Sequence, residues 1–207
     1  MTLVALLELA SVFVFALTGA LAASRAQLDL VGFVFLASLT AVGGGTLRDL
    51  VLGQGAVFWV ARPQMIGLAA IAAVIVFFTA HLLESRYRAL LWLDACALAV
   101  AVPAGVGVAL AQGQGWPVLL MMGVATGCFG GLMRDVVCNE VPLVLRAGEL
   151  YVTAAFAGAL AAVLALAAGL DQRAALIACA AVTLALRAGS LVFGWKLPAY
   201  RPRPPRR

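Results

Sequence analysis

The sequence predicts an all-α integral membrane protein with seven transmembrane helices, arranged as two inverted three-helix repeats plus a seventh helix. Three observations carry this prediction. The composition is 65% hydrophobic and only 11% charged, which is typical of a surface that meets lipid rather than water. Seven apolar stretches are long enough to span a bilayer, and the two halves of the chain share a motif at a fixed offset.

Each predicted span contains about 20 mostly apolar residues, the length that crosses a hydrocarbon core. The spans lie at about residues 3–23, 30–52, 64–83, 89–111, 117–138, 148–169 and 174–195. They form a single transmembrane domain over residues 1–195, with repeat one at 1–84, repeat two at 89–170 and helix seven at 174–195. The first span has no basic residue before its apolar run and carries Glu8, so we expect a retained helix rather than a cleaved signal peptide.

Basic residues outside the spans predict the orientation, because cytoplasmic loops are enriched in lysine and arginine. Nine fall on one side and two on the other. The nine are Arg25, Arg86, Arg88, Arg146, Lys196, Arg201, Arg203, Arg206 and Arg207, and the two are Arg62 and Arg173. We therefore expect a multi-pass protein of the cell inner membrane, with its N-terminus outside and its C-terminus in the cytoplasm.

Residues 196–207 form the predicted basic cytoplasmic tail, in which Pro198, Pro202, Pro204 and Pro205 disfavour a helix. Because the tail carries five basic residues, the net charge of +5 points to a membrane surface and not to nucleic acid. Anionic lipid is the expected partner of this tail.

The internal repeat relates TAVGGGTLRDLV, residues 40–51, to TGCFGGLMRDVV, residues 126–137, at an offset of 86. Six of the twelve positions are identical, and the same offset pairs Glu8 with Asp94 and Gly19 with Gly105. Each repeat holds three spans, an odd number, so the second repeat starts on the opposite side of the membrane. Inverted repeats are widely used by transport proteins, whose sites lie near the midplane at the repeat interface.

Consecutive glycines inside the second and fifth spans predict a kink or break in each helix, because glycine loosens a helix and bares its backbone. The residues concerned are Gly43, Gly44 and Gly45 in one span and Gly130 and Gly131 in the other, with Thr40 and Thr126 one turn before. Close helix packing through small residues is the alternative interpretation.

Six ionisable residues lie inside the repeats, although each costs about 2.5 to 3.5 kcal/mol at a helix centre on insertion scales. They are Glu8, Arg48, Asp49, Asp94, Arg134 and Asp135. Such a set implies a polar cavity, a gating cluster or, in the simpler interpretation, a clamp between helices. Depth along each helix, at about 1.5 Å per residue, predicts pairs of Glu8 with Arg48 and of Asp94 with Arg134. Adjacent helix residues point about 100° apart, so Asp49 and Asp135 need not be taken up by the neighbouring arginines. Each cluster then has a formal charge of −1.

Other polar and reactive residues are expected to have structural roles. The cysteines Cys96, Cys128, Cys138 and Cys179 show no metal-ligand spacing and are expected to be small buried apolar residues without a disulfide. Arg187 is expected to extend its side chain towards the cytoplasmic interface, and His81 and Glu84 to lie at a solvated helix end. The sequence contains no nucleophile–base constellation, phosphate loop or metal cluster, so we expect neither an enzyme nor a cofactor.

The GGGTLRD stretch, the following GQGAVFWV and the second motif GGLMRD resemble the trimeric intracellular cation (TRIC) channels in their prokaryotic form. They are also similar to related bacterial membrane proteins with a "glycine transporter" domain. The resemblance implies a seven-helix protomer, a homotrimer and a potassium-permeable pore in each protomer, bordered by the kinked second and fifth spans. Animal members carry a lysine motif in the fourth span that is linked to voltage response, and this fourth span has no lysine.

Passive conduction of a monovalent cation, with potassium as the permeant ion, is therefore the predicted function. A secondary transporter of a small solute such as glycine is the main alternative, since interrupted helices and buried charges serve both. A membrane scaffold without a permeation path is the third. The expected partners are the lipid bilayer, with possible bound lipid, and two further copies of the chain.

Overall fold

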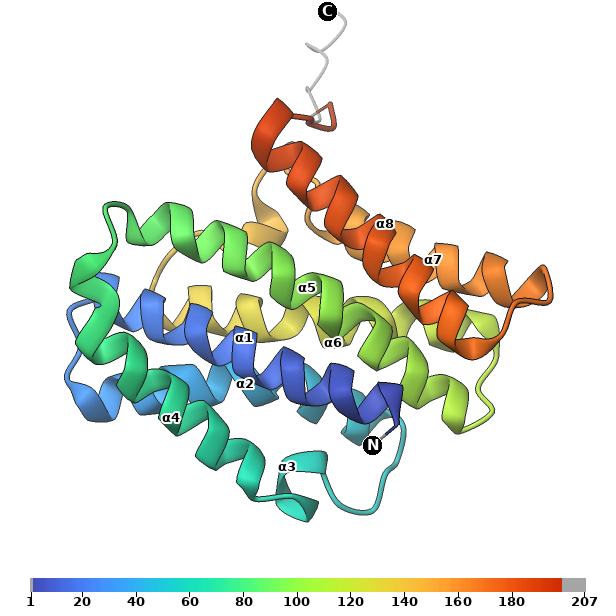
Figure 1. Ribbon diagram of the computed structural model, residues 1–207, viewed down its shortest axis with the longest axis horizontal. Helices are drawn as coiled ribbons and strands as arrows, with labels where there is room; N and C mark the ends of the chain where they lie inside the picture. Colours follow the sequence, from blue (N-terminus) through green and yellow to red (C-terminus); the bar gives the residue numbers. More distant parts are fainter. Residues whose placement is uncertain (1, 199–207) are drawn as a thin grey trace, which may run out of the picture.

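Helices account for most of residues 2–198, the part of the chain that the computed structural model describes (Figure 1). The α-helices are α1 (Leu3–Arg25), α2 (Leu30–Val51), α3 (Phe58–Ala61), α4 (Gln64–Thr79), α5 (Arg86–Ala111), α6 (Trp116–Val137), α7 (Val152–Ala167) and α8 (Gln172–Phe193). Two 3-10 helices follow α4 and α6: η1 (Ala80–Leu82) and η2 (Leu143–Leu145). The tail arginines Arg201, Arg203, Arg206 and Arg207 and three of the four tail prolines lie outside the described residues.

Six helices in the described part are long and apolar enough to cross a membrane, counting α4 together with η1. The expected span at 148–169 is shorter, because α7 begins only at Val152 and has 16 residues. The preceding residues form η2 and a loop with Gly148 at φ +86°, a conformation that favours glycine and ends regular helix. The chain therefore forms a multi-pass helical membrane protein with one short apolar helix.

Several helices begin at polar residues whose side chains accept hydrogen bonds from the first-turn amides. Thr2 caps α1, Asp29 caps α2, Ser85 caps α5 and Asp171 caps α8. Such caps satisfy amides that have no partner within the helix, so the loop residues fix where the helices start.

Helices α1 and α5 lie side by side at the centre and run in opposite directions, as do α2 and α6 (Figure 1). Helix α4 packs on α1 and α2, while α7 packs on α5 and α6. The three helices α1, α2 and α4 thus correspond to α5, α6 and α7 in inverted orientation, as the motif offset predicted. Helix α8 stands outside the repeats and packs on α5 and α7.

The glycines of the motifs let α2 and α6 touch through their backbones. A Cβ atom built on Gly44 would lie 2.1 Å from the carbonyl oxygen of Thr126, and one built on Gly130 would lie 2.3 Å from that of Thr40. The offset of 86 relates the two contacts, because Gly44 corresponds to Gly130 and Thr40 corresponds to Thr126. Both helices remain α-helical across their glycines, so an interruption of either helix is contradicted. The expected close packing through small residues is present.

Candidate functional site: two buried charge clusters

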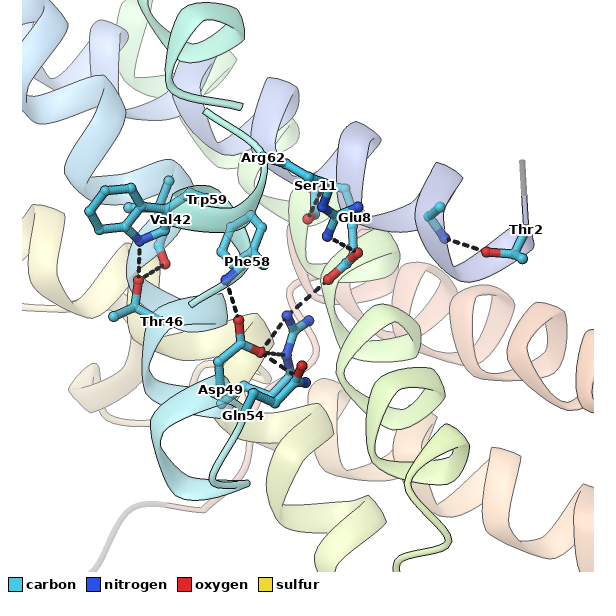
Figure 2. A network of polar contacts seen from close by, with 12 residues as sticks. Thr2, Glu8, Ser11, Val42, Thr46, Asp49, Gln54, Phe58, Trp59 and Arg62 are labelled. Atoms are coloured by element: carbon cyan, nitrogen blue, oxygen red, sulfur yellow. Dashed lines mark hydrogen bonds and ion pairs between the residues drawn. The ribbon is translucent and has the colours of Figure 1, made fainter. Parts of the chain in front are cut away.

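The first cluster joins α1, α2 and the segment after α3 (Figure 2). Arg48 Nη2 lies 2.9 Å from Glu8 Oε1, as the depth argument predicted, and Arg62 Nη2 lies 2.6 Å from Glu8 Oε2. Arg48 Nε also donates to Asp49 Oδ1 at 2.8 Å. The side chain of Arg48 is 2% exposed, whereas that of Arg62 is 34% exposed. The cluster is therefore buried on its α2 side and reachable by solvent on its α3 side.

Helix α3 is held against this cluster by Asp49. Asp49 Oδ2 accepts the backbone N–H of Phe58 at 2.7 Å (Figure 2). The Phe58 ring is buried beside Gly45, where a Cβ atom would lie only 2.5 Å from it, and Arg48 stands over the ring at 5.6 Å. Trp59 Nε1 donates to Thr46 Oγ1 at 2.9 Å. A short apolar segment thus covers the charged end of α2.

The second cluster repeats this arrangement in α5 and α6. Arg134 Nη1 lies 2.7 Å from Asp94 Oδ1, and Arg134 Nε donates to Asp135 Oδ1 at 2.8 Å. Asp135 Oδ2 accepts the backbone N–H of Leu143, the first residue of η2, at 2.9 Å. Leu143 therefore corresponds to Phe58, because each donates its backbone N–H to the aspartate of its cluster. The two residues are 85 positions apart, one fewer than the offset of the motifs.

Two expectations about these carboxylates were wrong. Asp49 and Asp135 are both bound by the arginine that precedes them, because each arginine donates from Nε to its neighbour and from a terminal nitrogen to the carboxylate of the next helix. Their remaining oxygens hold α3 and η2. The first cluster also gains Arg62, so two carboxylates meet two guanidinium groups and its formal charge is zero. The second cluster of Asp94, Arg134 and Asp135 has the predicted formal charge of −1.

Arg187 and Cys96 also differ from expectation. The guanidinium of Arg187 is fully buried, pairs with Glu149 Oε2 at 3.0 Å and lies 5.0 Å above the Tyr151 ring. It does not reach the interface, because the loop before α7 supplies both partners inside the protein. Cys96 is exposed and Cys138 is partly exposed, whereas Cys128 and Cys179 are buried as expected, and all four cysteines are free. His81 and Glu84 are exposed, as expected.

Sequence reasoning missed the residues that close the clusters, namely Phe58, Arg62 and Leu143. One signal was available: the stretch AVFWV is apolar but too short to span, and it follows the motif within ten residues. An apolar segment of that kind between two spans is best explained when it folds back onto the protein.

Cavities lie at both ends of the bundle, and an apolar pocket of about 290 Å³ lies along α2 and α6 beside Trp59 and Met133. A cavity of about 730 Å³ opens between the start of α1, the end of α5 and the start of α8, and its wall includes Gln54, whose amide is 3.4 Å from Asp49 Oδ1. At the opposite end, Ser24, Gln27 and Arg86 line one of about 180 Å³. A pocket of about 10 Å³ beside Glu8 and Arg48 has room for about one water molecule. Within the described residues, no group of three or more histidine, cysteine, aspartate or glutamate side chains could hold a metal ion.

A family model described as "Glycine transporter" matches the chain twice, at residues 5–81 and at residues 91–167. The two matches are displaced by the same 86 residues as the motifs. A UPF0126 membrane protein from Vibrio cholerae is 37% identical over 204 residues, covering 96% of this chain and 83% of the relative. The UPF0126 inner membrane protein YadS of Escherichia coli is 36% identical over 156 residues, covering 73% of each chain.

Among solved structures, the TRIC trimeric intracellular cation channel orthologue from Rhodobacter sphaeroides is similar over the whole fold. It is 46% identical to this chain with a TM-score of 0.90, covering 94% of this chain and 100% of the other. The similarity therefore includes both repeats and the additional α8.

Proposed function

This chain belongs to the prokaryotic TRIC family, whose family model is described as a glycine transporter, and from that premise we propose that it is a potassium-permeable cation channel. Each protomer would contain its own pore, bordered by α2 and α6. The observation that carries the proposal is the similarity to the Rhodobacter sphaeroides channel, which extends through every helix of that chain.

The geometry of the charge clusters supports conduction of cations rather than anions. Buried ionisable groups at membrane depth mark ion and substrate pathways, and here they join α1 to α2 and α5 to α6. The second cluster carries a formal charge of −1, and fixed negative charge raises the local concentration of cations. Phe58 and Leu143 lie against the two clusters, each through a backbone N–H that donates to the cluster's aspartate.

Single-channel recording of the purified protein in planar bilayers, with unequal KCl on the two sides, tests this proposal. Discrete unitary currents that reverse towards the potassium equilibrium potential are the expected result. Reversal towards the chloride potential, or no unitary current at high protein load, would contradict it.

A secondary transporter of a small solute such as glycine is the second candidate, and the description of the matching family model favours it. The inverted repeats serve this function equally well. Saturable uptake of labelled glycine into proteoliposomes, without unitary currents, would favour the transporter over the channel.

The oligomeric state and the orientation in the membrane are proposed from the same family membership. The Rhodobacter sphaeroides protein is described as trimeric, and we propose a homotrimer in the inner membrane with an external N-terminus. Native mass spectrometry in mild detergent should give three copies, and a monomer or dimer alone would contradict the trimer. Cysteine accessibility from the two sides of sealed vesicles, at single sites in the loops, would test the orientation.

A further inference from the structure

We infer that Arg187 is a gating residue, whose guanidinium exchanges between Glu149, its partner in the described conformation, and the buried carboxylate of Asp94. Pairing with Glu149 leaves the second cluster with its formal charge of −1, which favours cations. Pairing with Asp94 neutralises that cluster. The inference rests on the proposed cation channel, and it gives a function to α8, the helix outside the two repeats.

Most of the buried polar atoms that lack a partner lie around the second cluster. Seven buried side-chain nitrogen and oxygen atoms of residues 2–198 make no hydrogen bond, and five of them belong to this region. The five are Asp94 Oδ2, Arg134 Nη2, the Tyr151 hydroxyl, and Nε and Nη2 of Arg187. The first cluster contributes none. Because buried polar groups are normally paired, we expect a second arrangement in which the free donors of Arg187 meet the free oxygen of Asp94.

Tyr151 lies next to both residues. The guanidinium carbon of Arg187 is 5.0 Å from the centre of the Tyr151 ring. The Tyr151 hydroxyl is 3.0 Å from the point that a Cβ atom on Gly131 would occupy, and Asp94 Oδ1 and Arg134 Nη2 are 3.5 and 3.6 Å from the same point. The ring of one buried side chain therefore contacts Arg187, while its hydroxyl approaches the second cluster.

Repeat one shows the arrangement that the exchange would produce. Glu8, the equivalent of Asp94, is bound by two arginines, and Arg62 is the one outside the motif. The offset of 86 places Gly148 at the position of Arg62, so repeat two has no second guanidinium of its own. Arg187 of α8 is fully buried in the same region and can supply this missing charge.

The two partners of Arg187 differ in their exposure to solvent. The side chain of Glu149 is 26% exposed, whereas those of Arg187 and Asp94 are 0% exposed. Water can solvate Glu149 when the guanidinium leaves, and ion pairs with an exposed member contribute little to stability. Asp94 gains a second charged donor where solvent does not reach, and a buried charge without sufficient partners is costly. The exchange therefore has a small cost at Glu149 and a gain at Asp94.

The segment after α8 holds Glu149 against Arg187. The backbone oxygen of Gly148 accepts the N–H of Leu197 at 2.9 Å, and Glu149 forms an antiparallel β-bridge with Lys196. These contacts fix the loop that carries Glu149. A shift of the segment after α8 therefore determines which of the two carboxylates Arg187 binds.

Single-channel conductance of matched variants, measured in neutral lipid at low KCl, tests the exchange. Glu149→Gln keeps the shape of the side chain and removes its charge, so Arg187 should move to Asp94 and the conductance should fall severalfold. Arg187→Gln should not lower the conductance, because the second cluster keeps its charge of −1. Glu140→Gln is the matched control, because Glu140 is 31% exposed and pairs with Arg25 at 3.0 Å, and it should have no effect.

The double variant of Glu149→Gln and Arg187→Gln separates gating from a structural role. If Arg187 lowers the conductance by moving to Asp94, its removal should restore the conductance that Glu149→Gln had lost. If the ion pair only supports the loop, the double variant should be as poor as Glu149→Gln or poorer. The structure of Glu149→Gln gives a readout without currents: a nitrogen of Arg187 should lie within about 3.2 Å of Asp94 Oδ2.

The outcomes distinguish this inference from the proposed function. Cation currents in a double variant that conducts as poorly as Glu149→Gln would overturn the exchange and leave the channel intact. A guanidinium that stays over Tyr151 in the structure of Glu149→Gln would do the same. If the unmodified protein gives no cation currents while that structure shows Arg187 bound to Asp94, the channel is overturned and the exchange between carboxylates stands.

Discussion

Replacing Gly44 by alanine should be among the most destabilising single-methyl changes in this protein. The added Cβ atom would lie 2.1 Å from the carbonyl oxygen of Thr126, whereas ordinary contact begins at 3.4 Å, so α2 and α6 must separate by at least about 1.3 Å. The obstacle is backbone and cannot rotate away. Overpacking typically costs about 1–3 kcal/mol, and we expect a loss of about 3 kcal/mol in the free energy of unfolding.

The assay is thermal unfolding in detergent micelles, with Gly67→Ala as the matched control. Gly67 lies in α4 with nothing within 4 Å of its added Cβ, so this variant should be neutral or slightly stabilised by the better helix propensity of alanine. A cost of about 3 kcal/mol should lower the Tm of Gly44→Ala by roughly 6–12 °C for a chain of this size. If both variants melted together, the interpretation of Gly44 as a contact point would be refuted.

Three further outcomes are expected. Arg134→Ala should cost about 3–5 kcal/mol, because it leaves Asp94 and Asp135 buried without a cation; a Tm equal to that of Arg25→Ala would contradict this. Asp49→Asn turns the neutral cluster positive and Asp135→Asn neutralises the negative one, so both should lower potassium conductance, most strongly at low ionic strength. Equal relative losses at low and high KCl would argue against an electrostatic origin. Truncation after Leu197 should leave folding and currents in neutral lipid unchanged, and loss of either would show that the tail is more than a lipid contact.

Helix positions and ion pairs could be predicted because they follow from sequence spacing and membrane depth. Glu8 and Arg48 had to lie at one level if both helices span the bilayer, and the structure places them 2.9 Å apart. The inverted relation of the repeats followed from an odd number of spans between two copies of one motif. These inferences use only the offset between the two motifs and the lengths of the apolar segments, and both can be read from a single sequence.

The contacts made by loops could not be predicted in the same way. Nothing in the spacing shows that Asp49 would hold the amide of Phe58, or that Arg62 would return to α1, because these contacts depend on how α3 folds back. The glycines were ambiguous for a related reason. Glycine permits both a broken helix and a close helix contact, and only the position of Thr126 decides between them.

The four-residue spacing from Gly44 to Arg48 fixes the position of an ion pair relative to a helix–helix contact. Residues four apart lie on the same face of a helix, one turn from each other, so the contact with Thr126 and the ion pair to Glu8 are set by a single turn of α2. One residue inserted between them would rotate Arg48 by about 100° and carry it about 1.5 Å along the axis, away from its partner, while Gly44 stayed in place. The same spacing from Gly130 to Arg134 fixes the other half. Length variation in this protein is therefore expected in the loops and not within these two turns.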